Sequence, residues 1–417
     1  MKQKPIKRRA YLFLQGPPGP FFLRLGSLLS EHGFPVHRIN FNGGDRADWP
    51  KGAVDYTGSA QDWPHYFDRF LVKHGITDLI LFGDCRPLHE AAHGMATLRK
   101  LRIHVFEEGY IRPDWVTMEL DGVNGHSTLS KDPNWYLERA KKLPPLPDLP
   151  SIPASAGRRW REAAGYYAKS IFQSWRFLHY ESHRPDPWFA EATGWGLRLL
   201  GEKRAERRTG RTLARIAQLQ HFLLPLQLSS DHQIRVHSPF RNMKVAADYV
   251  IDSFARAAPE GLHLVIKQHP LDNGLVNWRR FIARQAHRHG IGDRVHFVEG
   301  GNIDLMVRQA RGLVTVNSTT GTLALSAGVP VKVLGRAIYD IDGITDQGLL
   351  DDFWSQPDAP DPDIYDAFCR TLLDRCLIRG GFASEEGLRL LIDAAFRRLT
   401  ADEQASLVAV GRLEHNP

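Results

Sequence analysis

Short apolar runs of β-strand length recur along the chain, and most are followed by a polar loop and a stretch of helical periodicity. In the first part of the chain this pattern predicts strands at 11–14, 36–41, 78–82 and 103–106, with helices reaching Glu31 and spanning 88–100. In the second part it predicts strands at 222–227, 263–268, 295–298 and 312–316, with helices at 243–258 and 322–327. Strand, polar loop and helix in alternation are typical of doubly wound parallel sheets. The fold class expected is therefore α/β, with two Rossmann-like halves.

The segment between the two halves has a different composition. Residues 141–153 are rich in proline, and residues 158–215 are basic and contain several tryptophans. We therefore expect an N-terminal Rossmann-like domain at 1–150, linker or crossover helices at 151–215, a second Rossmann-like domain at 216–360 and C-terminal helices packing across both lobes at 361–417.

Bulk composition narrows the class of protein. A chain of 417 residues with 42% hydrophobic residues can fill two cores. The three cysteines, Cys85, Cys369 and Cys376, lie far from any CxxC or Cys/His zinc spacing, so neither a disulfide framework nor a metal site is expected. The longest apolar runs are strand-sized, which predicts a cytoplasmic protein without a membrane span or signal peptide. The net charge of +7 favours an anionic partner.

The most specific motif is Phe106-Glu107-Glu108-Gly109-Tyr110-Ile111-Arg112-Pro113, at a predicted strand end. A carboxylate at such a place can act as a general base or a nucleophile, and Arg112 could bind an acidic group of the substrate. Successive residues of a strand point to opposite faces, so at most one of Glu107 and Glu108 is expected to face a cleft while the strand continues. A solvated acidic turn is the alternative.

Two further loops have features of a binding site for an anionic group. Lys267-Gln268-His269-Pro270 follows the strand at 263–268, and proline holds the preceding histidine in extended geometry. Asn317-Ser318-Thr319-Thr320-Gly321 joins a strand to a helix, and its hydroxyls and backbone amides suit a phosphate. The alternatives are a turn that ends a strand and ordinary helix capping.

Other loops are expected to line the site less specifically. Gln15, Gly16 and Gly19 belong to a glycine and proline loop that lacks the GxGxxG spacing, which disfavours a dinucleotide cofactor. Gln227 and Asp231 follow the first strand of the second half, where they are predicted to lie in the cleft. The loop after the strand at 78–82 contributes Asp84 and Arg86.

His89-Glu90-Ala91-Ala92-His93 matches the HExxH pattern of zinc proteases. The third ligand of the longer zincin motif is missing, and Leu88, Ala92 and Met95 are suited to packing on a sheet. We therefore expect these histidines to have a structural role.

The basic segment at 158–215 combines arginines with Trp160, Trp175, Trp188 and Trp195. Amphipathic helices of this composition suit an anionic bilayer surface, and a plain solvated helix face is the alternative. No recognition motif for nucleic acid accompanies the charge, so no nucleic-acid partner is expected.

Taken together, the motifs resemble those of the bacterial capsule polysaccharide synthesis and export proteins that act as β-Kdo transferases. The resemblance rests on five segments: QGPPGPFF at 15–22, FGDCRPLH at 82–89, FEEGYIRPDWVTME at 106–119, KQHPLD at 267–272 and NSTTGTLALSAGVPV at 317–331. The glycine and proline loop and the acidic motif are most similar to the member that places the first Kdo on a phosphatidylglycerol lipid.

The resemblance implies a GT-B-like retaining glycosyltransferase with its two domains facing a central cleft, the acceptor domain first and the CMP-Kdo domain second. It implies no cofactor and no obligatory metal, with Glu108 as the catalytic residue. Related chain-extending domains carry aspartate in place of Glu108, within an E-D-G motif. Because of this difference, both roles, nucleophile and base, stay open for Glu108. His269 and Pro270 would contact the cytidine monophosphate, with Ser318 and Thr319 at its phosphate.

The partners implied are CMP-Kdo, a (lyso)phosphatidylglycerol acceptor, the inner face of the inner membrane and a capsule synthesis or export complex. Two other hypotheses remain open. One is a non-catalytic capsule export factor with a transferase-like fold, and the other is a transferase for another nucleotide sugar.

Overall fold

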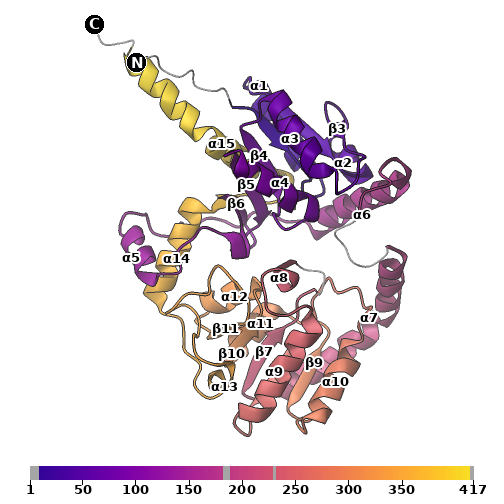
Figure 1. Ribbon diagram of the computed structural model, residues 1–417. Coiled ribbons are helices and arrows are strands. Elements are labelled where there is room, and N and C mark those ends of the chain that lie inside the picture. Colours follow the sequence, from indigo (N-terminus) through magenta and orange to yellow (C-terminus); the bar gives the residue numbers. More distant parts are fainter. Residues whose placement is uncertain (1–8, 182–187, 229–231, 414–417) are drawn as a thin grey trace. The chain divides into compact units, whose positions relative to one another are not determined.

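The computed structural model describes residues 9–181, 188–228 and 232–413 (Figure 1). The chain forms two compact units. The first comprises residues 1–128, 148–183 and 373–417, and the second comprises residues 129–147 and 184–372. The predicted α/β class with two Rossmann-like halves is confirmed, because each unit is built on its own largely parallel sheet.

The first unit contains a seven-stranded sheet in the order β12-β6-β5-β4-β1-β2-β3. Strands β1 to β5 are parallel, whereas β6 runs antiparallel to β5 and β12 antiparallel to β6. The strands are β1 (Tyr11–Phe13), β2 (Val36–Asn40), β3 (Val54–Asp55), β4 (Asp78–Phe82), β5 (Arg102–Glu108), β6 (Trp115–Leu120) and β12 (Leu377–Arg379). The helices are α1 (Phe21–Glu31), α2 (Gly43–Asp48), α3 (Trp63–His74), α4 (Pro87–Leu98), η1 (Asn124–His126), α6 (Ala156–Phe172), η2 (Ser174–Arg176) and α15 (Glu385–Leu413).

Alternation along the strands divides the core of this unit between the two faces of the sheet. Phe13 and Phe106 pack with α1 and α15 on one face, and Leu12 and Val105 pack with α3 and α4 on the other. Burial on both faces explains why the strands read as continuous apolar runs.

The second unit contains a five-stranded parallel sheet in the order β11-β10-β7-β8-β9. Its strands are β7 (His221–Pro225), β8 (His263–Lys267), β9 (Val295–Val298), β10 (Gly312–Thr315) and β11 (Val331–Val333). Its helices are α5 (Pro133–Ala140), α7 (Trp188–Ile216), α8 (His232–Arg235), α9 (Met243–Ala257), α10 (Trp278–Arg288), α11 (Ile303–Gln309), α12 (Thr320–Ser326) and α13 (Leu350–Phe353). Helices α9, α10 and α13 cover one face of the sheet and bury Phe222, Leu264 and Val314.

The units differ from the predicted domain boundaries at 150, 215 and 360. Residues 129–147 belong to the second unit, where Lys131 Nζ donates hydrogen bonds to the carbonyl oxygens of Ala337, Ile338 and Asp340. The predicted crossover segment is divided, with α6 in the first unit and α7 in the second.

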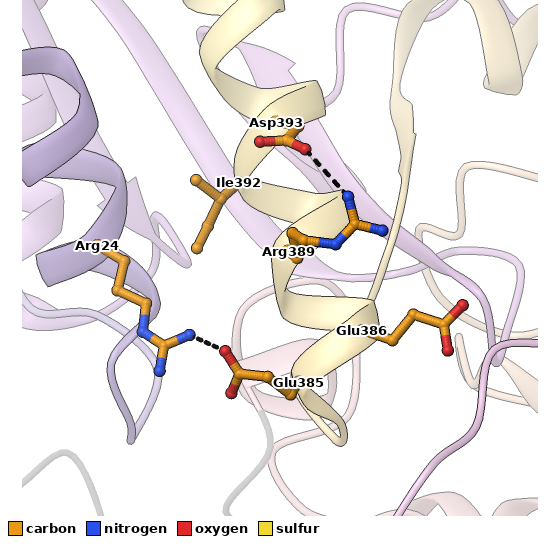
Figure 2. A pocket seen from close by; sticks show the side chains of 6 residues that line it. All are labelled: Arg24, Glu385, Glu386, Arg389, Ile392 and Asp393. Carbon is orange, nitrogen blue, oxygen red and sulfur yellow. Dashed lines mark hydrogen bonds and ion pairs between the residues drawn. The ribbon is translucent and has the colours of Figure 1, made fainter.

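The predicted C-terminal helical segment is also divided between the units. Helix α14 (Pro362–Arg375) begins in the second unit, and the chain then returns to the first with β12 and α15. Helix α15 packs on α1, with an ion pair between Arg24 and Glu385 at its beginning (Figure 2). The described contacts of α15 therefore lie in one unit.

Candidate functional site

The order of the strands reverses once in each parallel sheet, and such a switch point is where open α/β sheets bind ligands. In the first unit the reversal lies between β1 and β4, whose ends lead to Gln15 and to the loop at 83–86. In the second unit it lies between β7 and β10, whose ends lead to Gln227 and to the loop at 317–320. The topology thus places many of the predicted site residues at two switch points.

Gln15 is held in a buried polar network at the first switch point. Its Nε2 donates to the hydroxyl of Tyr166 at 2.6 Å and to that of Tyr180 at 3.2 Å. The Tyr166 hydroxyl also accepts from Asn42 Nδ2 at 2.9 Å and donates to Asp45 Oδ1 at 2.9 Å. Because Tyr166 belongs to α6, the network fixes α6 against the carboxyl end of the sheet. The sequence analysis did not identify this tyrosine.

The loop at 15–20 is held close to α2. A Cβ at Gly16 would lie 2.8 Å from the ring of Phe22, and Gly19 has a φ of +109°. The Gly19 amide donates to Asp48 Oδ2 at 2.8 Å. Burial, with a smaller effect from Asp45, raises the pKa of Asp48 to about 6 despite this hydrogen bond. Both predicted glycines therefore have a conformational role.

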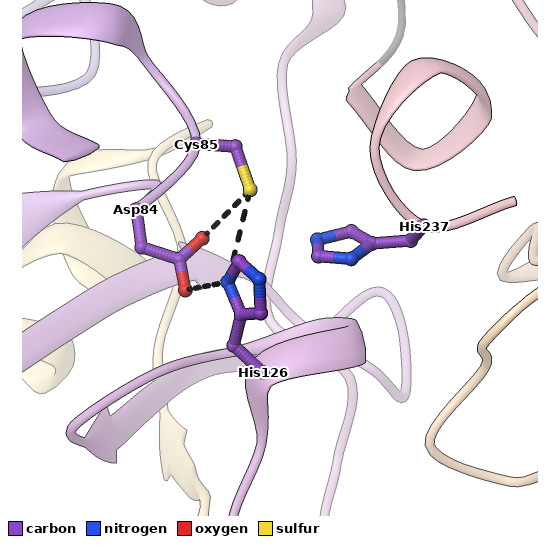
Figure 3. Close-up of side chains that lie close together, drawn as sticks. All are labelled: Asp84, Cys85, His126 and His237. Atoms are coloured by element: carbon purple, nitrogen blue, oxygen red, sulfur yellow. Dashed lines mark hydrogen bonds and ion pairs between the residues drawn. The ribbon is translucent and has the colours of Figure 1, made fainter. Parts of the chain in front are cut away.

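The loop after β4 holds the other predicted residues of this unit. Asp84 is buried, and its Oδ2 accepts from the Val123 amide at 3.2 Å and contacts His126 Nδ1 at 3.2 Å (Figure 3). The Arg86 guanidinium lies over the ring of Phe82, 5.7 Å from its centroid.

Glu107 and Glu108 were predicted to follow a strand that ends at residue 106, but they are the last two residues of β5. Strand β5 extends through both glutamates because it pairs with the antiparallel strand β6, which was not predicted. Thr117 of β6 lies opposite Glu107, and Val116 lies opposite Glu108. The strand continues through both glutamates, so their side chains point to opposite faces of the sheet.

Glu108 forms an ion pair that the sequence did not indicate. Its Oε1 lies 2.5 Å from Nη2 of Arg159 in α6, and both side chains are about one third exposed, at 35% and 33%. Arg159 also lies over the ring of Phe382, 5.0 Å from its centroid. Glu107, on the other face, lies near Gly83, with Oε2 3.2 Å from where a Cβ of Gly83 would be.

Arg112, the cation expected near the acidic motif, is exposed in the turn after β5. Its Nε donates to the carbonyl oxygen of Gly109 at 3.2 Å. Among the described contacts, the cation paired with Glu108 is Arg159 and not Arg112.

The two histidines of the HExxH pattern contact separate backbone carbonyls. Nδ1 of His89 lies 2.7 Å from the oxygen of Gly83, and Nε2 of His93 lies 2.5 Å from the oxygen of Asp121. Both contacts join α4 to neighbouring loops, which agrees with the structural role expected for them.

At the second switch point Gln227 and Asn317 form a reciprocal pair. Gln227 Nε2 donates to Asn317 Oδ1 at 3.1 Å, and the Asn317 amide donates to Gln227 Oε1 at 3.2 Å. Both residues are buried, with Gln227 4% and Asn317 8% exposed. Their two hydrogen bonds join the loops that follow β7 and β10. Asp231 lies outside the described residues.

The hydroxyl-rich loop is partly satisfied by its own hydrogen bonds. The Ser318 hydroxyl donates to Thr320 Oγ1 at 3.1 Å and accepts from the Thr320 amide at 3.1 Å. Thr319 is the N-cap of α12 but makes no side-chain capping bond. The structure thus shows local capping by Ser318, and the hydroxyl protons can still rotate towards a ligand.

The loop after β8 is organised by a residue that the sequence analysis did not identify. The buried carboxylate of Asp272 accepts from Gln268 Nε2, Trp278 Nε1 and the Gly274 amide at 2.9–3.0 Å. This network fixes the His-Pro turn, in which Pro270 is exposed. The turn follows Lys267 directly.

His269 and Lys267 have defined environments in this loop. His269 Nδ1 accepts from the Leu271 amide at 3.0 Å, so the neutral ring carries its proton on Nε2. Burial, followed by the charge of Arg198 in α7, lowers the pKa of Lys267. The end of β8, the strand next to β7, therefore combines two cations, Lys267 and Arg198, with an imidazole N–H donor.

No helix within the described part of the chain is both long and apolar enough to cross a membrane. The longest described helices, α7 and α15, both carry many charged residues.

Comparison with known proteins gives consistent matches over most of the chain. Among solved structures, the chain is similar to the β-Kdo 2,7 transferase KpsC of Thermosulfurimonas dismutans, with a TM-score of 0.42, 14% identity and coverage of 92% of this chain and 99% of that one. Its sequence is 34% identical to the capsule polysaccharide modification protein LipB of Neisseria meningitidis serogroup B, over 90% of this chain and 91% of LipB. It is 35% identical to the capsule polysaccharide export protein KpsS of Escherichia coli, over 88% of this chain and 95% of KpsS.

The family model described as capsule polysaccharide biosynthesis protein matches residues 77–383, a range that includes β4, β5 and the whole second sheet. With these relatives and this family match, the chain belongs to the capsule polysaccharide biosynthesis protein family.

Proposed function

We propose that the protein is a retaining glycosyltransferase that moves Kdo from CMP-Kdo to a (lyso)phosphatidylglycerol acceptor in capsule synthesis. The observation that carries the proposal is the carboxylate of Glu108 at the end of β5, held by Arg159 beside a switch point. A positioned carboxylate can act at the anomeric carbon as nucleophile or base. We assign Arg159 to orient Glu108, and Arg112 keeps the role proposed for it, binding an acidic group of the substrate.

The second unit would bind the donor. Lys267, Arg198 and the Nε2 proton of His269 supply positive charge and a hydrogen-bond donor for the phosphate and carboxylate of CMP-Kdo. The Gln227–Asn317 pair and the hydroxyls of the loop at 318–320 add neutral donors at the adjacent strand ends. These groups would stabilise the leaving cytidine monophosphate without requiring a metal.

The acceptor proposal is supported by an apolar surface on the first unit, which we call the α6 surface. Its members are exposed by 43% to 81%: Trp160, Ile171, Phe172, Trp175 and Leu178. The exposed cations Arg161 and Lys169 belong to the same helix. Aromatic rings beside cations suit the headgroup region of an anionic bilayer, where a phosphatidylglycerol acceptor would be found.

The test is product formation by the purified protein. Incubation with CMP-Kdo generated in situ and a fluorescent phosphatidylglycerol analogue should add the mass of one Kdo to the lipid. Glu108→Gln should lower the rate by about 100-fold or more, because it removes the charge while keeping the shape. Glu138→Gln, which changes an exposed glutamate paired with Lys141 on α5, should leave the rate unchanged.

The outcomes separate the alternatives. Full activity of a folded Glu108→Gln protein would overturn the assignment of Glu108. Thermal stabilisation by a UDP- or GDP-sugar but not by CMP would indicate another nucleotide sugar. An absence of both product and nucleotide binding would favour the export factor. The family membership holds in every case.

A further inference from the structure

Asp84, Cys85 and His126 bring three different metal-ligating atoms together within the first unit (Figure 3). Asp84 and Cys85 follow β4, and His126 ends the short helix η1. Cys85 Sγ lies 3.2 Å from Asp84 Oδ1 and 4.0 Å from His126 Nδ1, and Asp84 Oδ2 lies 3.2 Å from the same nitrogen.

These separations match those of a tetrahedral zinc site. Zn–S bonds of about 2.3 Å and Zn–N and Zn–O bonds of about 2.0–2.2 Å at tetrahedral angles place pairs of donor atoms about 3.3–3.6 Å apart. The observed separations of 3.2–4.0 Å bracket that range, with Asp84 presenting Oδ1 to Cys85 and Oδ2 to His126, so the carboxylate must turn to bring one oxygen between them.

The surroundings favour a cation. Three acids, Asp84, Glu107 and Glu90, lie close enough to the Cys85 thiol to interact with it electrostatically. A fourth acid, the buried Glu119, also interacts electrostatically with Asp84. A divalent ion would offset this concentration of negative charge, and zinc deprotonates a coordinating thiol outright.

Two other interpretations of the cluster are weaker. Cys85 is a poor nucleophile, because its thiolate is disfavoured by burial and by acidic neighbours. The same His126 nitrogen also faces both Asp84 and Cys85, whereas a catalytic triad uses the two ring nitrogens separately. Hydrogen bonds from the Cys85 thiol and the His126 ring to Asp84 are the metal-free alternative, and the measurements below distinguish it from a bound ion.

We propose that Asp84, Cys85 and His126 bind a zinc ion, with water as the fourth ligand on the exposed side of His126. The ion would tie the loop at 83–86 to η1 beside Glu107, and thus hold the first switch point in place. Its role is structural, so the site is compatible with a transfer reaction that needs no catalytic metal. This proposal departs from the sequence analysis, which expected no metal site, because Cys85 and His126 are far apart in the chain and come from different elements.

The test uses the untagged full-length protein and Co²⁺ in place of zinc. After removal of metals by chelation and dialysis, one equivalent of Co²⁺ should produce a thiolate-to-cobalt charge-transfer band in the near ultraviolet. Cys85→Ser should abolish the band, and the same replacement at a cysteine of the second unit, Cys369→Ser, should retain it. A band that persists in Cys85→Ser would overturn the assignment.

Zinc binding provides a second measurement, without reliance on activity. His126→Ala should fold, because that side chain is 50% exposed, and should weaken zinc binding by at least about tenfold in calorimetry. Zinc should raise the melting temperature of the wild type and not that of His126→Ala. The proposal is wrong if metal-free wild-type protein gives neither a cobalt band nor zinc-dependent stabilisation.

Discussion

Asp48 couples the folded state of the first unit to pH. Its carboxylate accepts a hydrogen bond from Gly19, yet burial raises its pKa to about 6 from the ordinary value of 3.8. The folded protein therefore binds the proton more tightly than the unfolded chain does. The resulting stability is present below about pH 4 and is lost as the pH rises through about 6.

We expect the free energy of unfolding of the wild type, relative to Asp48→Asn, to fall by about 2 kcal/mol between pH 4 and pH 7. Urea unfolding at a series of pH values measures this difference. Asp68→Asn is the control, because the hydrogen bond and charge of Arg99 lower the pKa of Asp68 and give its effect the opposite sign. A difference that does not vary with pH would contradict the assignment to Asp48.

Single residues also show where sequence reasoning stops. Glu107 and Glu108 could be identified because they follow an apolar run, and alternation correctly indicated that they would diverge. Arg159 could not be identified, since it is one of many arginines in its segment and is separated from Glu108 by about fifty positions. Arg159 reaches Glu108 because the hydrogen bonds of Tyr166 position α6. No local sequence pattern encodes that long-range contact.

At the scale of elements, the buried strands were the most predictable. Strands β4 and β9 have the predicted bounds, and the other predicted strands differ by a few residues at their ends. Strand β6 was missed because Val116 and Met118 alternate with polar residues, so it has no continuous apolar run of the kind from which the other strands were predicted. Strand β12 has only three residues, too few to show a period.

Helix α6 and the turn after it are the element in which we expect membrane binding. One side of α6 is buried against α2, where Gly43 and Gly44 leave room for Lys169 and Tyr166. The α6 surface remains exposed, with Phe172 at 81% and Trp175 at 68%. Burying two aromatic rings in a bilayer would contribute several kcal/mol, at about 1.5–3 kcal/mol for each large side chain.

We predict that the protein sediments with phosphatidylglycerol vesicles and that the double change Phe172→Glu with Trp175→Glu lowers vesicle binding by at least about tenfold. Raising the salt concentration should weaken binding of the wild type, because cations of α6 contribute. Val72→Glu is the control, since Val72 is 62% exposed on α3 of the same unit. Equal sedimentation of the double variant and this control would exclude the α6 surface as the membrane contact.

At the scale of the whole molecule, the first unit is assembled from distant parts of the chain. Arg9 donates a hydrogen bond to the carbonyl oxygen of Leu399 in α15 and pairs with Asp78 at the start of β4. Tyr11 donates to the same carbonyl oxygen at 3.2 Å. The core between the sheet and α15 includes Leu388, Leu391 and Ala395, all buried. The first unit therefore cannot complete its core until the second has been synthesised.

This arrangement predicts that ending the chain after residue 372 unfolds the first unit, because Phe21, Phe106 and Met118 would lose the helix that covers them. The truncated protein should lose one transition in urea unfolding, whereas a chain ended after residue 401 keeps the described α15 contacts and should unfold as the full chain does. Leu391→Ala in the full-length protein tests the same contact without truncation, and should lower the stability of the first unit by about 2–5 kcal/mol, the usual range for this buried change. Unchanged unfolding of both the shortest chain and Leu391→Ala would mean that α15 contributes little to the core, despite its burial.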